Sequence, residues 1–166
     1  MKNTMKKILA LALVICSVFA LASCSLFQPK PKQDLEKAAK NLEKAGYDVD
    51  YETDDSDNAI VVEYIEASDE DGNKITIIKY ATRKAAKLAY ENEKIRRDYK
   101  IDTLENEIDS LKYQMKKFAE DDEKEMYEKY IEELKEELQT LKKEEVLGKS
   151  GKIVWYGSKD AVKATK

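Results

Sequence analysis

Ala59-Ile-Val-Val-Glu-Tyr-Ile-Glu66 and Ile75-Thr-Ile-Ile-Lys-Tyr80 are two runs rich in β-branched and aromatic residues, joined through the turn Asp69-Glu-Asp-Gly-Asn73. Such residues favour strands, and the Asp71-Gly72 pair is a strong hairpin signal. The acids of the turn also suggest calcium binding, but an EF-hand loop spaces its acids differently and ends in a distant Glu. The stretch therefore predicts an antiparallel β-hairpin whose acids belong to the turn.

A helix and a further strand are predicted upstream of this hairpin. Asp34 is a suitable N-cap, and Gly46 is placed to end the helix in a left-handed conformation. After the glycine, apolar residues alternate with acids over 47–52, which predicts a half-buried strand at a sheet edge. Within the predicted helix, apolar residues recur at helical spacing: Leu35, Ala38, Ala39 and Leu42.

Two segments resemble each other, Tyr80-Ala-Thr-Arg-Lys-Ala-Ala-Lys87 and Tyr156-Gly-Ser-Lys-Asp-Ala-Val-Lys163. Each follows an apolar run, and each offers a hydroxyl N-cap for a helix, Thr82 or Ser158. The similarity predicts two strand-to-helix turns of one kind, with both helix starts at one end of a sheet. Exposed N–H groups there could bind an anion, although capping alone, or chance in a chain rich in Lys and Ala, also explains the pattern.

Between those segments lies a long helical excursion with two apolar seams, which turns at the acids 120–123. Their steps of three and four residues are those of coiled-coil a and d positions, and Gly148 is a natural stop for the returning helix. We expect an antiparallel coiled-coil hairpin; pairing of the seams between two molecules is the alternative. The arm either meets a partner or is an insertion without one. The seams are Ile101, Leu104, Ile108, Leu111, Met115 and Phe118, then Tyr127, Ile131, Leu134, Leu138 and Leu141.

These elements predict an α+β fold, in which a small antiparallel or mixed four-stranded sheet carries flanking helices and the protruding hairpin. Strands 75–80 and 153–156 would run parallel if they are neighbours, because a helical crossover joins them. The predicted organisation is 1–23 as signal peptide, 24–33 as tether, 34–96 with 148–166 as the α+β domain, and 97–147 as the helical hairpin arm.

The N-terminal segment combines a basic start, an apolar run over 8–20 and the sequence Leu21-Ala22-Ser23-Cys24. This order resembles the lipobox of bacterial lipoproteins. The resemblance implies cleavage before Cys24, lipidation of Cys24 with chains such as palmitate, and anchoring on the extracytoplasmic face of a cell-envelope membrane. An ordinary secretory signal and a single membrane helix are the alternatives, although the run is short for the roughly 20 residues that a span needs.

The charge balance and the residue types that the chain lacks restrict the functions that we expect for it. The chain has a net charge of −4, and lysines are the only charged residues of the predicted signal peptide, so the mature part is more acidic still. This balance argues against a nucleic-acid partner, whose phosphates need a basic surface. The chain has no histidine, and Cys16 and Cys24 are its only cysteines. No catalytic residue, metal or cofactor is therefore assigned, and the composition argues against an enzyme.

The function is predicted from the expected cellular location and from the residues expected on the surface. Leu42-Glu-Lys-Ala-Gly-Tyr-Asp-Val49 and Gly151-Lys-Ile-Val-Trp-Tyr-Gly-Ser-Lys-Asp-Ala-Val162 resemble small uncharacterised bacterial lipoproteins, which implies no activity. The favoured function is a non-catalytic interaction lipoprotein whose arm or sheet face contacts an envelope protein. The alternatives are ligand capture for a transporter and, last, an enzyme based on carboxylates or tyrosine. Because aromatic residues can stack on ligands, the candidate binding surface is Tyr80, Trp155 and Tyr156.

Overall fold

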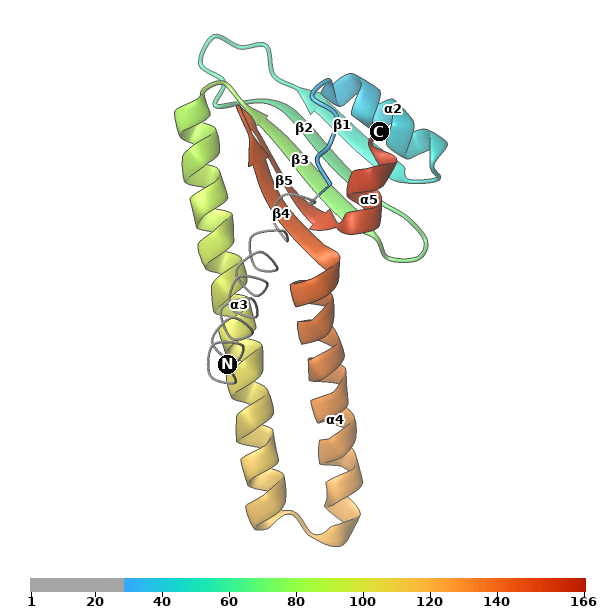
Figure 1. Cartoon of the computed structure of the whole chain (residues 1–166), viewed down its shortest axis with the longest axis vertical. Helices are drawn as coiled ribbons and strands as arrows, with labels where there is room; N and C mark the ends of the chain where they lie inside the picture. The colour runs from blue at the N-terminus through green and yellow to red at the C-terminus, as the bar shows by residue number, and fades with distance from the viewer. Residues whose placement is uncertain (1–28) are drawn as a thin grey trace, which may run out of the picture.

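A five-stranded antiparallel sheet organises residues 29–166, the part of the chain that this computed structural model describes (Figure 1). The strands are β1 (Asp48–Thr53), β2 (Val61–Ser68), β3 (Lys74–Tyr80), β4 (Glu145–Ser150) and β5 (Ile153–Ser158). Their order across the sheet is β1-β2-β3-β5-β4. The predicted hairpin is confirmed as the antiparallel pair of β2 and β3, and the predicted edge strand is confirmed as β1.

Helices α2 (Leu35–Lys44) and α5 (Lys159–Ala164) cover one face of the sheet (Figure 1). Alternate residues of each strand face them, because successive side chains of a strand point to opposite faces. Together these helix and strand residues form the main hydrophobic core. Its larger members are Leu35, Leu42, Ile65, Ile75, Ile77, Val146, Ile153, Trp155 and Val162.

Both ends of α2 form as the sequence predicts. The Asp34 side chain accepts a hydrogen bond from the backbone N–H of Lys37 at 3.1 Å, which caps the first turn. At the other end, Gly46 takes a φ of 92°, and the N–H of Tyr47 donates to the carbonyl of Leu42 at 3.1 Å. This is a Schellman closure, and it directs the chain straight into β1.

Strand β4 corrects the predicted sheet of four strands. Gly148 does not stop a helix; it pairs with Trp155 inside the hairpin of β4 and β5. A Cβ at this position would overlap the Trp155 indole, so the strand needs glycine here. The additional strand also reverses the chain once more, and β3 and β5 therefore pair antiparallel, not parallel. The predicted boundary between 147 and 148 falls inside β4.

The two similar strand-to-helix turns form at opposite ends of the sheet, not at one end as predicted. Both predicted N-caps are confirmed: Thr82 accepts from the N–H of Ala85 at 3.1 Å, and Ser158 accepts from the N–H of Ala161 at 3.2 Å. However, the antiparallel pairing of β3 and β5 separates the two helix starts along the sheet. They cannot share an anion.

Helix α3 (Arg83–Phe118) is continuous and belongs to both parts of the molecule. Its first turns pack on the second sheet face, where Ala86 meets residues of β4 and β5. Its remainder runs antiparallel to α4 (Asp121–Gln139) as a projecting arm (Figure 1). A short π-helix, η1 (Thr140–Glu144), then leads into β4. The two predicted seams meet within this one chain, and their buried residues are Leu104, Ile108, Ile131, Leu134 and Leu141.

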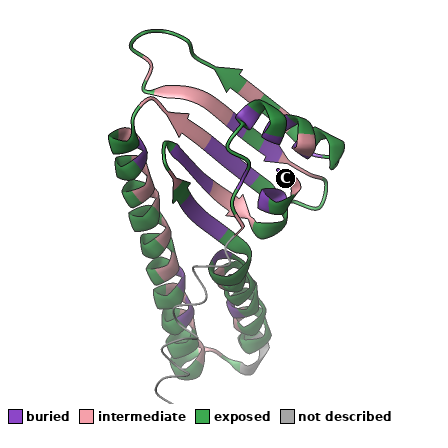
Figure 2. Ribbon diagram, turned by 45° about the horizontal axis from the view of Figure 1, so that its top comes forward, coloured by how far each residue is buried: buried purple, intermediate pink, exposed green. Residues whose placement is uncertain are grey.

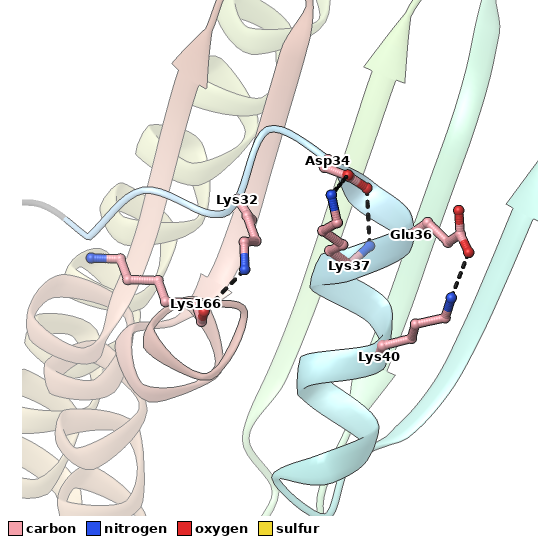
Figure 3. Close-up of polar contacts among 6 residues, drawn as sticks. All are labelled: Lys32, Asp34, Glu36, Lys37, Lys40 and Lys166. Atoms are coloured by element: carbon pink, nitrogen blue, oxygen red, sulfur yellow. Dashed lines mark hydrogen bonds and ion pairs between the residues drawn. The ribbon is translucent and has the colours of Figure 1, made fainter.

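The predicted signal peptide, Cys24 and the first residues of the tether lie outside the described part of the chain. The rest of the tether is held against the domain: Pro31 is buried, and Lys32 Nζ donates to the backbone oxygen of Lys166 at 3.3 Å (Figure 3). Two ion pairs of α2, Asp34–Lys37 and Glu36–Lys40, lie beside it on the surface (Figure 3). Among residues 29–166, no helix has the length and apolar character to cross a membrane.

Candidate functional site

The structure separates the three residues of the predicted binding surface. Trp155 and Tyr156 are neighbours on β5 and therefore face opposite sides of the sheet, as predicted. Trp155 lies in the main core with only 2% of its surface exposed, and it packs across Gly148. Its role is thus structural, and the surface role predicted for it is not available in this fold.

Tyr80 and Tyr156 lie together on the second sheet face. Both are half-buried and pack against the small core between α3 and the sheet, which contains Ala86, Leu147 and Val154. Burial raises the pKa of Tyr80, and Tyr156 and Glu93 raise it further. The structure therefore joins two of the three predicted residues in one aromatic cluster, although α3 covers part of it.

Beyond this cluster, the second face continues over β2 and β1 as an acidic surface. The register aligns Asp50, Glu66, Thr76 and Tyr156 in one row across four strands. The Tyr64 hydroxyl donates to Glu66 Oε2 at 2.7 Å. Burial and this carboxylate raise the pKa of Tyr64 well above its usual range, with smaller effects from Tyr156 and Asp50. The row thus places aromatic rings beside carboxylates, and its two carboxylates, Asp50 and Glu66, line a hollow of about 410 Å³ over β1 and β2.

A cavity of about 180 Å³ lies where α3, η1 and β4 meet. Apolar side chains of Leu141, Leu147 and Tyr156 line it together with the cations of α3. Small-molecule sites usually measure about 300–1,000 Å³, so this cavity is small for a captured ligand.

Arg97 lines this cavity and binds the segment of chain that returns from the arm to the sheet. Its Nη2 donates to the carbonyl oxygens of Leu141 at 2.6 Å and Glu145 at 3.3 Å. Carbonyls at the end of a helix lack partners within the helix, so a cation is well placed there. Arg97 Nε is buried and finds no hydrogen-bond partner among residues 29–166. The side chain thus links the arm to the sheet, and its bonds to the backbone indicate a structural role.

The distal end of the arm exposes aromatic side chains. Phe118 is the last residue of α3 and the last member of the predicted outgoing seam, yet 67% of its surface is exposed. The reason is that α4 begins with charged residues over 121–125 and its apolar seam starts only at Tyr127, so the returning seam offers no apolar side chain level with Phe118. Tyr113 packs edge-on against Phe118, with ring centroids 6.3 Å apart. Lys117 Nζ lies 5.2 and 5.3 Å from the two ring centroids.

A shallow groove on one flank of the arm adds further exposed side chains. Met126 and Tyr130 of α4 face Leu111 and Gln114 of α3 across it. The Tyr130 hydroxyl donates to Glu107 Oε1 at 3.0 Å, and this carboxylate raises the pKa of Tyr130. The sequence predicted Phe118 as a seam residue and assigned no binding role to Met126 or Tyr130; the signal for such a role was an aromatic residue at the very end of the seam. We call Tyr113, Lys117, Phe118, Met126 and Tyr130 the distal cluster.

The carboxylates and tyrosines of the described residues are the side chains whose chemistry can be compared. Among the described side chains, those of 29–120 and 123–166, no group of three or more carboxylates or other metal-ligating residues is placed to hold a metal ion. Each tyrosine whose pKa departs from its usual value is raised, by burial or by a neighbouring carboxylate, and so stays protonated near neutral pH. Such hydroxyls donate hydrogen bonds instead of accepting protons. These tyrosines are Tyr47, Tyr51, Tyr64, Tyr80 and Tyr130.

Comparison with protein-family models, with curated proteins and with solved structures finds no match for this chain. The distal cluster and the sheet face are therefore interpreted from their own residues.

Proposed function

We propose that the protein is a lipid-anchored lipoprotein of the cell envelope, which acts as a non-catalytic interaction module. The lipobox resemblance at Leu21-Ala22-Ser23-Cys24 supports the anchor, with Cys24 as the lipidated residue. One acyl chain gives marginal membrane binding, at about 0.8 kcal/mol per buried methylene, and two or more chains hold firmly. The address would be the extracytoplasmic face of the membrane.

The tether supports a domain held close to that membrane. Seven peptide units separate Cys24 from Pro31, and an extended chain of that length reaches at most about 25 Å. From Pro31 onward the chain is fixed to the domain through burial and the contact of Lys32 with Lys166. The anchor would therefore restrict the domain to a layer next to the lipid headgroups, leaving the arm as the part with the longest reach.

The arm, read as an antiparallel coiled coil, would present the distal cluster to a partner protein. One observation carries this proposal: Phe118, Met126 and Tyr113 are large side chains left exposed at the end of a projecting element. Aromatic residues and methionine are enriched where proteins bind one another. Ligand capture for a transporter has less support, because the apolar cavity at the base of the arm is small and the larger hollows, of about 640 and 720 Å³, are lined mostly by polar and charged residues.

The anchor is tested by Cys24→Ala in the full chain. We expect the parent protein to fractionate with membranes and to incorporate a labelled fatty acid. The variant should lose the label, keep its signal peptide and migrate as a larger species. A variant that is still processed and still labelled would contradict the proposed lipidation.

The partner contact is tested by site-specific photocrosslinking in intact cells. A photoreactive phenylalanine analogue replaces Phe118 in one strain and Ile60 in another; Ile60 is a matched control because it is 69% exposed but lies in the loop before β2. Position 118 should give a discrete adduct with one envelope protein, identified by mass spectrometry, and position 60 should not. The same adducts from both positions, or none from 118, would overturn the arm as the contact element.

A further inference from the structure

The charged side chains of residues 29–166 are distributed unevenly over the fold. The tether, α2 and α5, which are residues 29–44 and 159–166, contain eight lysines and four acids. Residues 45–73, which include β1, β2 and their loops, contain eleven acids and neither lysine nor arginine. In residues 74–158, nineteen basic and nineteen acidic side chains balance. The net charges of these parts are therefore +4, −11 and 0.

The positive part forms one face of the sheet domain. Helices α2 and α5 cover the same side of the sheet (Figure 1), and the tether passes α5 before it enters α2 (Figure 3). Lys32 Nζ donates to the backbone oxygen of Lys166 at 3.3 Å, and Asn41 Nδ2 donates to that of Thr165 at 3.1 Å. We call the exposed surface of 29–44 and 159–166 the basic face. Its lysines are all exposed: Lys30, Lys32, Lys37, Lys40, Lys44, Lys159, Lys163 and Lys166.

The acids of 45–73 are directed mostly away from the basic face. Strand alternation places four of them on the second sheet face, together with Tyr64. Six occupy the loops at the two ends of β2, which border the basic face. The remaining acid, Glu63, is on the side of α2, but it forms an ion pair with Lys79. The four acids of the second face are Asp48, Asp50, Glu52 and Glu66.

We propose that the basic face rests on an anionic lipid surface, so that the acidic second face of the sheet is turned away from the membrane. This orientation rests on the proposed lipid anchor, because the chain leading to Cys24 leaves the domain from the basic face. An extended chain of at most about 25 Å separates Cys24 from the buried Pro31, so the basic face is within reach of the headgroups.

The anchor is the reason for choosing lipid over another polyanion. A negatively charged membrane surface attracts nearby lysines and repels acids, over a Debye length of about 8 Å at physiological salt. Because the tether keeps the domain beside the headgroups, the effective concentration is high and weak attractions suffice. The opposite orientation would bring the acids of β1 and β2 against the same surface.

The orientation is tested by energy transfer from the protein to the membrane. The processed, fatty-acylated protein is reconstituted into vesicles in which a trace lipid carries an acceptor dye on its headgroup. A donor dye is attached to Ala45→Cys, at the end of α2, or to Asn92→Cys, at an exposed position of α3. The new cysteine is the only free thiol, since processing would remove Cys16 and lipidate Cys24.

In vesicles of phosphatidylglycerol and phosphatidylcholine in equal parts, transfer should be stronger from position 45 than from position 92. Added salt, or vesicles of phosphatidylcholine alone, should reduce this difference. Equal transfer from both positions in the anionic vesicles would overturn the orientation. Protein that does not float with phosphatidylcholine vesicles would contradict the anchor itself, so the two failures are distinguishable.

Charge reversal tests whether the basic face causes the orientation. Lys30, Lys44 and Lys166 are exposed and form no ion pair with another residue of 29–166. Changing all three to glutamate should lower the ratio of molecules in the proposed orientation to all others by about tenfold or more, since each basic side chain near the surface contributes about fivefold. The difference in transfer between positions 45 and 92 should then disappear.

The matched control reverses three lysines of α3, Lys84, Lys87 and Lys94. They are also exposed and without an ion pair among the described residues, and the net charge of the chain changes by the same amount. This variant should keep the stronger transfer from position 45, and circular dichroism confirms that both variants are folded. The same loss in both variants would show that only the overall charge matters and would contradict the assigned face.

Discussion

The sheet domain and the arm are stabilised in different ways. Fourteen residues are buried in the main core, and they come from both N- and C-terminal elements of the described chain. The arm buries only five, all from α3 and the segment that returns beside it. Figure 2 shows the same contrast, with buried colour concentrated on the sheet and exposed colour dominating the arm. The domain thus has a globular hydrophobic core, whereas the arm is held together by a single apolar seam.

This difference predicts which interactions each part depends on for its stability. Contacts in the arm join helices that follow each other along the chain, so closing the turn between them costs little entropy. Its ion pairs, such as Lys100–Glu137 at 2.9 Å and Lys142–Glu105, are on the surface and contribute little individually. The domain must bring distant segments together, but it then gains a close-packed interior. We therefore expect the two parts to lose structure separately.

The largest expected effect is at the packing of Gly148 on Trp155. Gly148→Val should destabilise the domain by about 3 kcal/mol, because its side chain would overlap the indole in a filled core. Trp155 is the only tryptophan, so its fluorescence during urea unfolding reports the domain, while circular dichroism at 222 nm is dominated by the arm helices. The fluorescence midpoint should fall well below the circular dichroism midpoint.

Lys149→Ala is the matched control, since it changes the next residue of β4, whose side chain is exposed. It should leave both midpoints nearly unchanged. Equal fluorescence midpoints for Gly148→Val and Lys149→Ala would show that the Trp155 side chain can move to make room for the valine. The core would then be less closely packed than described.

Gly148 also shows why one strand was missed from the sequence. Leu134, Leu138 and Leu141 continue the helical spacing to the start of η1, and a glycine soon after a helix usually ends it. The segment forms a strand and not a continued helix because Trp155 lies opposite Gly148 in the sheet. This contact exists only in the folded domain, so it cannot be inferred from the neighbouring sequence. The turn at Ser150-Gly151, ahead of an apolar strand, was the local signal for a hairpin. The caps of α2, in contrast, depend on neighbours in sequence and were predicted correctly.

The candidate site follows the same logic. Alternation along β5 predicted that Trp155 and Tyr156 face opposite sides, but not which side would be covered. Periodicity placed Phe118 in the seam, although exposure depends on where the returning helix begins. Whether an apolar side chain is buried or exposed depends on the helix or strand that packs against it. That element comes from another part of the sequence, so local patterns do not identify it.

The next largest effect is expected in the arm. Leu134→Ala should destabilise the pairing of α3 and α4 by about 2–3 kcal/mol, since a buried leucine loses its packing and leaves a cavity. Hydrogen exchange should show faster exchange of amides in 101–139, while amides of the sheet keep their protection. Lys135→Ala, at the next and exposed position, controls for changes in helix propensity. Loss of protection in the sheet would show that arm and domain unfold together.

The smallest expected effect is a loss of stability of the sheet domain, and not of the arm, at alkaline pH. Burial, together with Asp69, raises the pKa of Tyr47 from 10.0 to about 12 in the folded domain. Its contribution to stability is therefore full below pH 10 and is lost as pH rises from 10 through 12, because the unfolded chain ionises first.

Between pH 9 and 11, the free energy of unfolding reported by Trp155 fluorescence should fall by about 1 kcal/mol more in the parent chain than in Tyr47→Phe. Lysines that titrate in the same range affect both chains equally and cancel in the difference. Tyr99→Phe, an exposed position on α3, should behave like the parent chain. If Tyr47→Phe retained the full alkaline loss, Tyr47 would ionise without disturbing the core, and the domain would lack the close packing that distinguishes it from the arm.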